Sequence, residues 1–176
     1  MKNTTVRNAW LLSALWVLLI AGESEGGSVA NTSHILWPVL HFLFPAMTAA
    51  RFDFVHIVVR KTGHLFGYAM LSFLLYRSWW ATFAARAGVQ FLSWREMRRA
   101  WSWGAALQAL LGTVVVAGLD EWHQSFSPLR GAHLADVFLD ELGGLFAQSL
   151  ILTISAMPAM WRRRRMNLTS EPIPSP

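Results

Sequence analysis

Four apolar segments, each close to the length that a helix needs to cross a lipid bilayer, limit what this chain can fold into. They run approximately over residues 8–22, 54–80, 101–119 and 134–161, and a spanning helix needs about 17–25 mostly apolar residues. Only 14% of the residues are charged, compared with about 25% in soluble domains. A chain of 176 residues cannot bury that much apolar surface in its own core. The sequence therefore predicts an all-α fold, a polytopic integral membrane four-helix bundle.

The region around the first segment needs a separate interpretation. Residues 8–22 are short for a span, so they require a thin local bilayer or a contribution from their flanks. Lys2 and Arg7 precede them as in a signal peptide, but no Ala-x-Ala site follows, which favours an uncleaved helix. Residues 34–50 are apolar but contain two Pro and two His. We expect them to form an interfacial or re-entrant segment between helices 1 and 2.

The distribution of basic residues predicts the orientation in the membrane, because cytoplasmic loops collect Lys and Arg. With the N-terminus inside, eleven basic residues are cytoplasmic, and only Arg51, Arg60, Lys61 and Arg130 are external. Trp side chains prefer the membrane boundary, and five of them then mark its inner side: Trp79, Trp80, Trp101, Trp103 and Trp161. We expect both termini in the cytoplasm, a transmembrane domain over residues 1–160, and a basic, then Pro-rich cytoplasmic tail over residues 161–176.

In this orientation, the polar residues at three helix ends gather at the outer boundary. They are Arg60, Lys61 and His64 at the start of the second span, Asp120, Glu121, His123 and Gln124 at the end of the third, Arg130 in the following loop, and Asp136, Asp140 and Glu141 in the fourth. Half of the ten acidic residues therefore lie between Asp120 and Glu141, and all six His fall on the same side. We expect these helix ends to converge.

Helical spacing predicts how these residues face one another. His56, Arg60 and His64 recur every four residues and form one stripe, which Tyr68 continues. Asp120 shares a face with Gln124, as Asp136 does with Asp140. The small residues Gly63, Gly67, Gly143, Gly144 and Ala147 would let helix backbones approach closely. Because an unpaired charge is costly in a membrane, we expect Arg60 or Lys61 to pair with Asp136 or Asp140.

The charge of the cluster favours a functional site. With its three His neutral, the cluster has three cations and five acids, and a protonated His or a divalent cation would balance the difference. The spacing identifies no metal site, and the chain has no Cys that could supply a thiolate ligand or nucleophile. Ion pairs also hold membrane helices together, so a structural role is the alternative for each residue. The cluster as a whole exceeds what that role requires.

At these residues the sequence resembles the VanZ-like family of small membrane proteins. The first matching stretch is Lys61-Thr-Gly-His64-Leu-Phe-Gly-Tyr68. The second is Asp120-Glu121-Trp-His-Gln124-Ser-Phe126-Ser-Pro128-Leu-Arg130-Gly131, and it continues to Asp136, Asp140 and Gly143. Asp140 departs from the family pattern, which more often has Asn, and its added charge favours pairing with Lys61. The family takes its name from a protein that lowers sensitivity to the glycopeptide teicoplanin. The resemblance thus implies the cytoplasmic (inner) membrane of a bacterium, an envelope setting and a link to antibiotic resistance.

The first functional hypothesis is a membrane protein that binds or modifies a lipid-linked or cell-wall precursor at the outer boundary. The candidate catalytic residues are His64, Asp120, Glu121 and Gln124, and the candidate binding residues are Arg60, Lys61, Tyr68, Arg130, Asp136 and Asp140. Basic side chains would hold an anionic group such as phosphate. His64 would act as base or nucleophile, oriented by an Asp.

Three alternatives stay open beside it. A partial likeness to lipid phosphate phosphatases suggests an enzyme for a lipid-linked phosphate, but Asp136 stands where those enzymes have their attacking His. A non-catalytic shield or assembly partner in the membrane is the second alternative. A transporter is the third, and four spans with few polar residues in the third span disfavour it. Nucleic acid is not an expected partner, because the Arg runs flank the spans.

Overall fold

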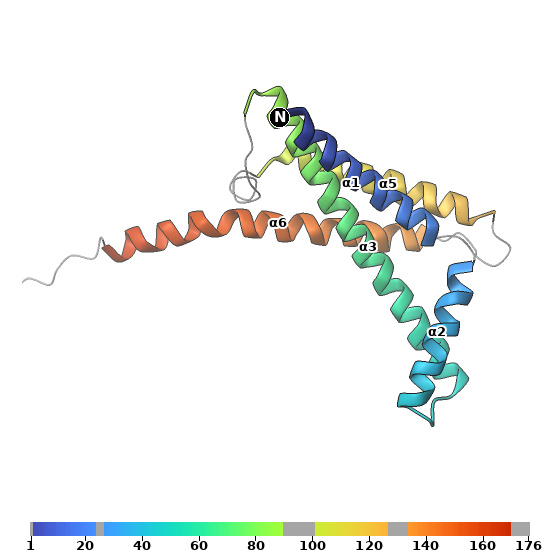
Figure 1. Ribbon diagram of the computed structural model, residues 1–176. Helices are drawn as coiled ribbons and strands as arrows, with labels where there is room; N and C mark the ends of the chain where they lie inside the picture. The colour runs from blue at the N-terminus through green and yellow to red at the C-terminus, as the bar shows by residue number, and fades with distance from the viewer. Residues whose placement is uncertain (1, 24–26, 90–100, 127–133, 170–176) are drawn as a thin grey trace, which may run out of the picture.

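The computed structural model describes the backbone of residues 2–23, 27–89, 101–126 and 134–169, and side chains within 4–22, 32–89, 101–126 and 134–156. This part of the chain is helical and contains no strand. The helices are α1 (Lys2–Glu23), α2 (Gly27–Leu43), α3 (Ala49–Arg86), α5 (Trp103–Gln124) and α6 (Leu134–Thr169) (Figure 1). The predicted all-α fold is confirmed at this level.

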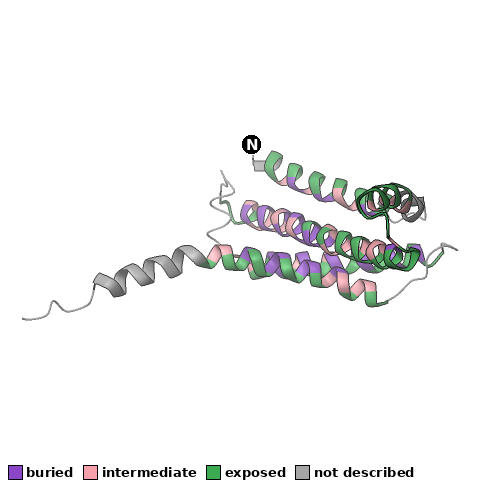
Figure 2. Cartoon of the chain, turned by 90° about the horizontal axis from the view of Figure 1, so that it is seen from below, coloured by how far each residue is buried: buried purple, intermediate pink, exposed green. Residues whose placement is uncertain are grey.

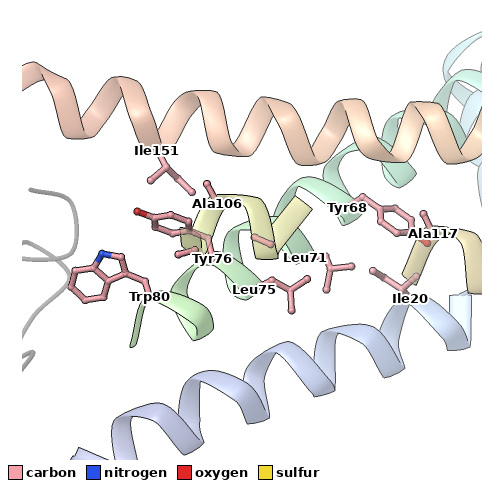
Figure 3. Packing of buried hydrophobic residues seen from close by; sticks show 11 residues of the cluster. Ile20, Tyr68, Leu71, Leu75, Tyr76, Trp80, Ala106, Ala117 and Ile151 are labelled. Carbon is pink, nitrogen blue, oxygen red and sulfur yellow. The ribbon is translucent and has the colours of Figure 1, made fainter. Parts of the chain in front are cut away.

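Helix α3 is the centre of the fold and contacts all four other helices. Thr48 caps its start by accepting a hydrogen bond from the Arg51 amide. Just after its end, Gly88 adopts a φ of 73°, a left-handed conformation that glycine takes without strain. The second half of α3 supplies most of the large core side chains, including Tyr68, Leu71 and Tyr76, which α1, α5 and α6 surround (Figure 3).

Helix α5 approaches α3 closely because it presents a row of small side chains. Ala105, Ala109, Thr113 and Ala117 recur every four residues, and each is fully buried. On the same helix, a Cβ added at Gly112 would come within 3.0 Å of a Leu75 methyl group. In lipid, small residues at a helix interface allow the close van der Waals packing that holds helices together. The sequence predicts such a seam on α3 and α6 only, so the row on α5 is an addition from the structure.

Polar side chains join α1 to α3 along the length of their contact. The indole of Trp10 donates to Thr82 Oγ1 (3.0 Å), and the indole of Trp16 donates to the Gly67 carbonyl (2.9 Å). Between them, the hydroxyls of Ser13 and Ser78 lie 3.0 Å apart, both buried. Such bonds between membrane helices contribute about 0.6 kcal/mol on average. Helix α1 is therefore fixed to the core by specific contacts as well as by apolar packing.

The outer surface of the helices is apolar, as a lipid environment requires. Exposed Leu, Val and Phe side chains cover the outward faces of α1, α5 and α6, while buried positions gather where the helices face one another (Figure 2). Among the described residues, three helices are long and apolar enough to cross a membrane: Thr4–Gly22, Trp103–Gln124 and Leu134–Ala156. They correspond to the first, third and fourth predicted spans. The helix Trp103–Gln124 extends five residues beyond the end predicted for the third span at 119.

Helix α3, the second predicted span, does not reach the same hydropathy. Its second half carries Tyr76, Arg77 and Trp79, and a helix that other helices surround needs fewer purely apolar side chains than one facing lipid. At 38 residues, it is about 57 Å long by helix rise, nearly twice the bilayer core of about 30 Å. A fourth span within α3, and the placing of both termini in the cytoplasm, stay predictions.

Residues 34–50 form the second half of α2, a short turn and the start of α3. Pro38 lies inside α2, and the chain reverses so that α2 lies beside the first turns of α3 (Figure 1). Trp37 packs edge-on against Phe52 (ring centroids 4.8 Å) and stacks on His41 (5.5 Å). The segment is thus a helical hairpin arm, and its predicted interfacial location stays a prediction.

Candidate functional site

The middle of α3, the end of α5 and the start of α6 meet, so that their polar residues come together as the sequence predicted. On α3 these residues lie near the middle of the helix and not at its start, because the helix begins at Ala49. Contacts between side chains that lie far apart in the sequence establish this. Tyr68 of α3 reaches Asp120 of α5, with 3.1 Å between hydroxyl and carboxylate oxygens. Lys61 of α3 reaches Asp136 of α6, with 3.2 Å between ammonium nitrogen and carboxylate oxygen. We call the group formed by His64, Tyr68, Asp120, Glu121, Gln124 and Asp140 the polar cluster.

Asp120 accepts two side-chain hydrogen bonds within the polar cluster. Its Oδ2 accepts hydrogen bonds from the Tyr68 hydroxyl and from the Gln124 amide, the latter at 2.9 Å. Gln124 lies one turn after Asp120 on the same face of α5, as the spacing predicted. All three side chains are buried. Two donors on one oxygen fix the orientation of the carboxylate and offset part of its desolvation.

The second centre of the cluster is the pair of His64 and Asp140. The His64 Nδ1 lies 3.4 Å from Asp140 Oδ1, an ion-pair contact longer than a well-formed hydrogen bond. Asp140 is only 1% exposed, and among the described residues neither of its carboxylate oxygens has a hydrogen-bond partner. The imidazole ring stacks on the Tyr68 ring, at 6.3 Å between centroids. His64 therefore has one ring nitrogen directed at a buried carboxylate, and Nε2 is its second protonation site.

Lys61 and Asp136 form a more exposed pair at the rim of the site. Their side chains are 55% and 32% exposed, so the pair stabilises the fold by at most about 1 kcal/mol. The Asp136 carboxylate also lies in the first turn of α6, where the helix dipole favours an anion. The side chain of Lys61 therefore remains accessible at the rim.

Glycine at position 143 brings α6 against α3 and so sets the geometry of the site. A Cβ at this position would overlap the backbone carbonyl oxygen of Leu65 and lie 3.2 Å from the Ala69 amide nitrogen. One turn earlier, the same close approach places Asp140 against His64. One turn later, Gln148 donates to the hydroxyl (2.8 Å) and the carbonyl (3.2 Å) of Ser72. The backbone contact and this polar contact together fix the register of the two helices.

The electrostatics of the site are dominated by buried acids. Asp120, Glu121 and Asp140 are at most 7% exposed, and Glu141 has a buried Oε2 without a hydrogen-bond partner among the described residues. Within the same part of the chain, no three His, Asp or Glu residues are arranged so that they could hold a metal ion. Among the described residues, His64 is the basic side chain that contacts Asp140.

Comparison with known protein families identifies the family of this chain. The model of the VanZ/LLP1 family matches residues 9–155, most of the chain. The chain belongs to the VanZ/LLP1 family. No curated protein and no solved structure matches it. The matched region begins within α1, includes α2, α3 and α5 and continues into α6, so it contains the whole polar cluster. This VanZ/LLP1 chain is a VanZ-like membrane protein.

The structure corrects two details predicted for this VanZ/LLP1 site. Asp140 pairs with His64 and not with Lys61, because Lys61 lies nearly one turn closer to the helix start and meets Asp136. Gly63 and Gly67 do not form the predicted seam, since a Cβ at either position would meet no atom within 4 Å, although the Gly67 carbonyl accepts the hydrogen bond from Trp16 of α1. The close contact is made by Gly143 instead.

The remaining candidates divide into three groups. Glu121 is buried at the cluster, and Arg60 is half-buried one turn before His64. His123 points outward from α5, and His56 stacks on Phe52 in the hairpin arm, at 5.8 Å between ring centroids. Arg130 and His133 lie outside the described residues. Glu141 was predicted as one of the five acids of the cluster but not as a candidate catalytic or binding residue.

Proposed function

We propose that this VanZ/LLP1 protein binds the anionic group of a lipid-linked envelope molecule at the polar cluster and acts on it through His64. The pairing of His64 with the buried Asp140 carries this proposal. A carboxylate at Nδ1 orients the imidazole and favours the tautomer whose Nε2 is unprotonated and can act as a base. The proton of a bound hydroxyl or water passes to Nε2, and Asp140 then faces an imidazolium. Lys61 and Arg60 supply positive charge for the anion.

The proposed setting is the outer leaflet of a bacterial cytoplasmic membrane. The eleven-to-four distribution of basic residues supports it. A link to tolerance of teicoplanin follows from the family resemblance, and a molecule on the outer side of this membrane is where such a link would act. A reporter fused after Pro176 tests the orientation. Activity of a reporter that folds only in the cytoplasm is expected, and activity of one that requires export would contradict it.

The function is tested by comparing lipids and cell-wall precursors in cells that contain the wild-type protein, H64A or H123A. His123 is the matched control, since it is an exposed His on a helix that contributes to the same end. We expect H64A to lose the precursor profile and the teicoplanin response of the wild type at equal membrane abundance, while H123A keeps both. If H64A behaves as the wild type does, His64 is not the acting residue.

A structural role is the second candidate, because the contacts of the cluster join three helices. It makes a different prediction for Asp140. If the cluster only holds helices together, D140A lowers the amount of protein in the membrane and any remaining protein has full function. If Asp140 positions His64, D140N keeps normal abundance but loses the response, because an amide of the same shape no longer stabilises the imidazolium.

A further inference from the structure

An apolar groove runs along the contact between α3 and α6, below the polar cluster. It has a volume of about 310 Å³ and an almost entirely apolar lining. Its floor is buried and consists of Ala69, Ala147 and Ile151, whereas Phe66, Phe146 and Leu150 form exposed walls. Small side chains in the floor and large ones in the walls give a channel, which Gly143 makes possible by bringing the two helices together.

The size of the groove identifies its occupant. Along α6 it extends from Phe146 to Ile154, about 12 Å by helix rise, so its mean cross-section is about 26 Å². A helix with side chains is at least 10 Å wide and needs about 80 Å². A methylene chain, whose carbons approach neighbours to about 4 Å, needs on the order of 15–20 Å². The groove therefore has the width of one hydrocarbon chain, and a helix of a second copy could cover it only from outside, by its side chains.

Charge can select the head group of the lipid whose hydrocarbon chain lies in the groove. Lys61 lies eight residues before Ala69 of the groove floor, two steps of four along the same row of α3 and about 12 Å towards its start, and its side chain is 55% exposed. In a bilayer, apolar contacts alone do not distinguish one lipid from another, because lipid tails are as apolar as the groove. An anionic head at Lys61 does make the distinction. The groove then fixes the chain of a molecule that its head has selected.

We infer that the ligand of this site is an anionic lipid, with its head at Lys61 and one hydrocarbon chain in the groove between α3 and α6. This inference rests on the proposed function and names the substrate class of the same site. It also explains why the cluster lies at the end of a lipid-facing groove, since a molecule anchored by its chain presents its head to the polar residues.

Photolabelling tests the inference with two probes, phosphatidylglycerol and phosphatidylcholine that each carry a diazirine in one acyl chain. The purified protein is placed in phosphatidylcholine vesicles with a trace of one probe, and labelled residues are identified by mass spectrometry. We expect the anionic probe to exceed the neutral one at Phe146 and Leu150 by about fivefold, the effect of about 1 kcal/mol for one basic residue near an anionic membrane surface. On the exposed face of α5, at Leu111 and Val115, the two probes should label equally.

Three variants complete the experiment. K61M should remove the preference for the anionic probe. A147F, which fills the floor, should lower labelling at Leu150 at least several-fold while α5 is labelled as before. F146A removes an exposed wall of the groove and should also lower labelling at Leu150, and it changes no buried side chain. F138A is the control for F146A, because Phe138 is exposed on α6 outside the groove.

Two results would overturn the inference. The first is equal labelling of the groove by both probes. The second is a groove that stays unlabelled while α5 is labelled, which is the result expected if another protein surface covers the groove. The outcome is separate from that of the proposed function. If A147F and F146A leave labelling and the precursor profile unchanged while H64A abolishes the profile, only the inference fails. If the groove is labelled as expected and H64A has no effect, only the proposed function fails.

Discussion

Replacing Gly143 with Ala should separate α6 from α3 and disrupt the site. The added Cβ would meet the Leu65 carbonyl oxygen and the Ala69 amide nitrogen, and these are backbone atoms that cannot rotate away. Overpacking of this kind costs about 1–3 kcal/mol, and the upper end applies because both helices must shift. The higher helix propensity of Ala returns about 1 kcal/mol. We therefore expect a net loss of about 2 kcal/mol in the free energy of unfolding.

Unfolding in detergent micelles by increasing fractions of sodium dodecyl sulfate, followed by circular dichroism, measures this change. G118A is the control, because a Cβ at Gly118 would meet no atom within 4 Å, and it should be neutral or slightly stabilising. G144A should fall between the two, since its Cβ would lie 3.3 Å from a Thr113 methyl group that can adjust. Equal stability of G143A and G118A would refute the reasoning that backbone contact at position 143 fixes the two helices.

Three further predictions address other contacts. A double-mutant cycle of Y68F and D120N should give a coupling of about 1–2 kcal/mol in the same unfolding assay, because both atoms of this 3.1 Å hydrogen bond are buried; independent effects would show that the bond does not form. S13A should lower stability by about 0.6 kcal/mol in the wild-type background and by much less in S78A, since the two hydroxyls lie 3.0 Å apart. K61M should change stability by less than about 0.5 kcal/mol, because the Lys61–Asp136 pair is exposed; a larger loss would mean that the rim is structural.

The sequence was sufficient to predict that the polar segments of these three helices meet, although those of α3 lie in the middle of the helix. An i, i+4 stripe on one helix and acids at the ends of two others must find one another in lipid, because unpaired charges there are costly. The partners within the cluster could not be predicted in this way. Lys61 and His64 are three residues apart and both face α6, so the choice between Asp136 and Asp140 depends on how far α6 is shifted along α3. That shift is set by the backbone contact at Gly143.

The helix seams illustrate a second limit of sequence reasoning. Gly63 and Gly67 resemble a packing motif, yet a Cβ at either would meet no atom within 4 Å. The predicted small residues on α6 do lie in a close contact, and the row Ala105, Ala109, Thr113 and Ala117 on α5 is buried without having been predicted. Small residues show where a close approach is allowed, but the lengths and positions of the neighbouring helices decide where it occurs. For the same reason, the interhelical bonds of Trp10 and Trp16 had no signal in the sequence, since their partners lie 72 and 51 residues away.

One crosslinking measurement tests the central claim most directly, namely that α3 and α6 meet at an outward-facing polar site. The chain has no Cys, so a variant with Cys in place of Lys61 and Asp136 reacts only at these positions. Intact cells are treated with a short bifunctional maleimide that does not cross membranes, and the joined peptides are identified by mass spectrometry. We expect the two positions to be linked within one chain in intact cells. Single modifications without a link, or a link that forms only after the cells are lysed, would contradict the account.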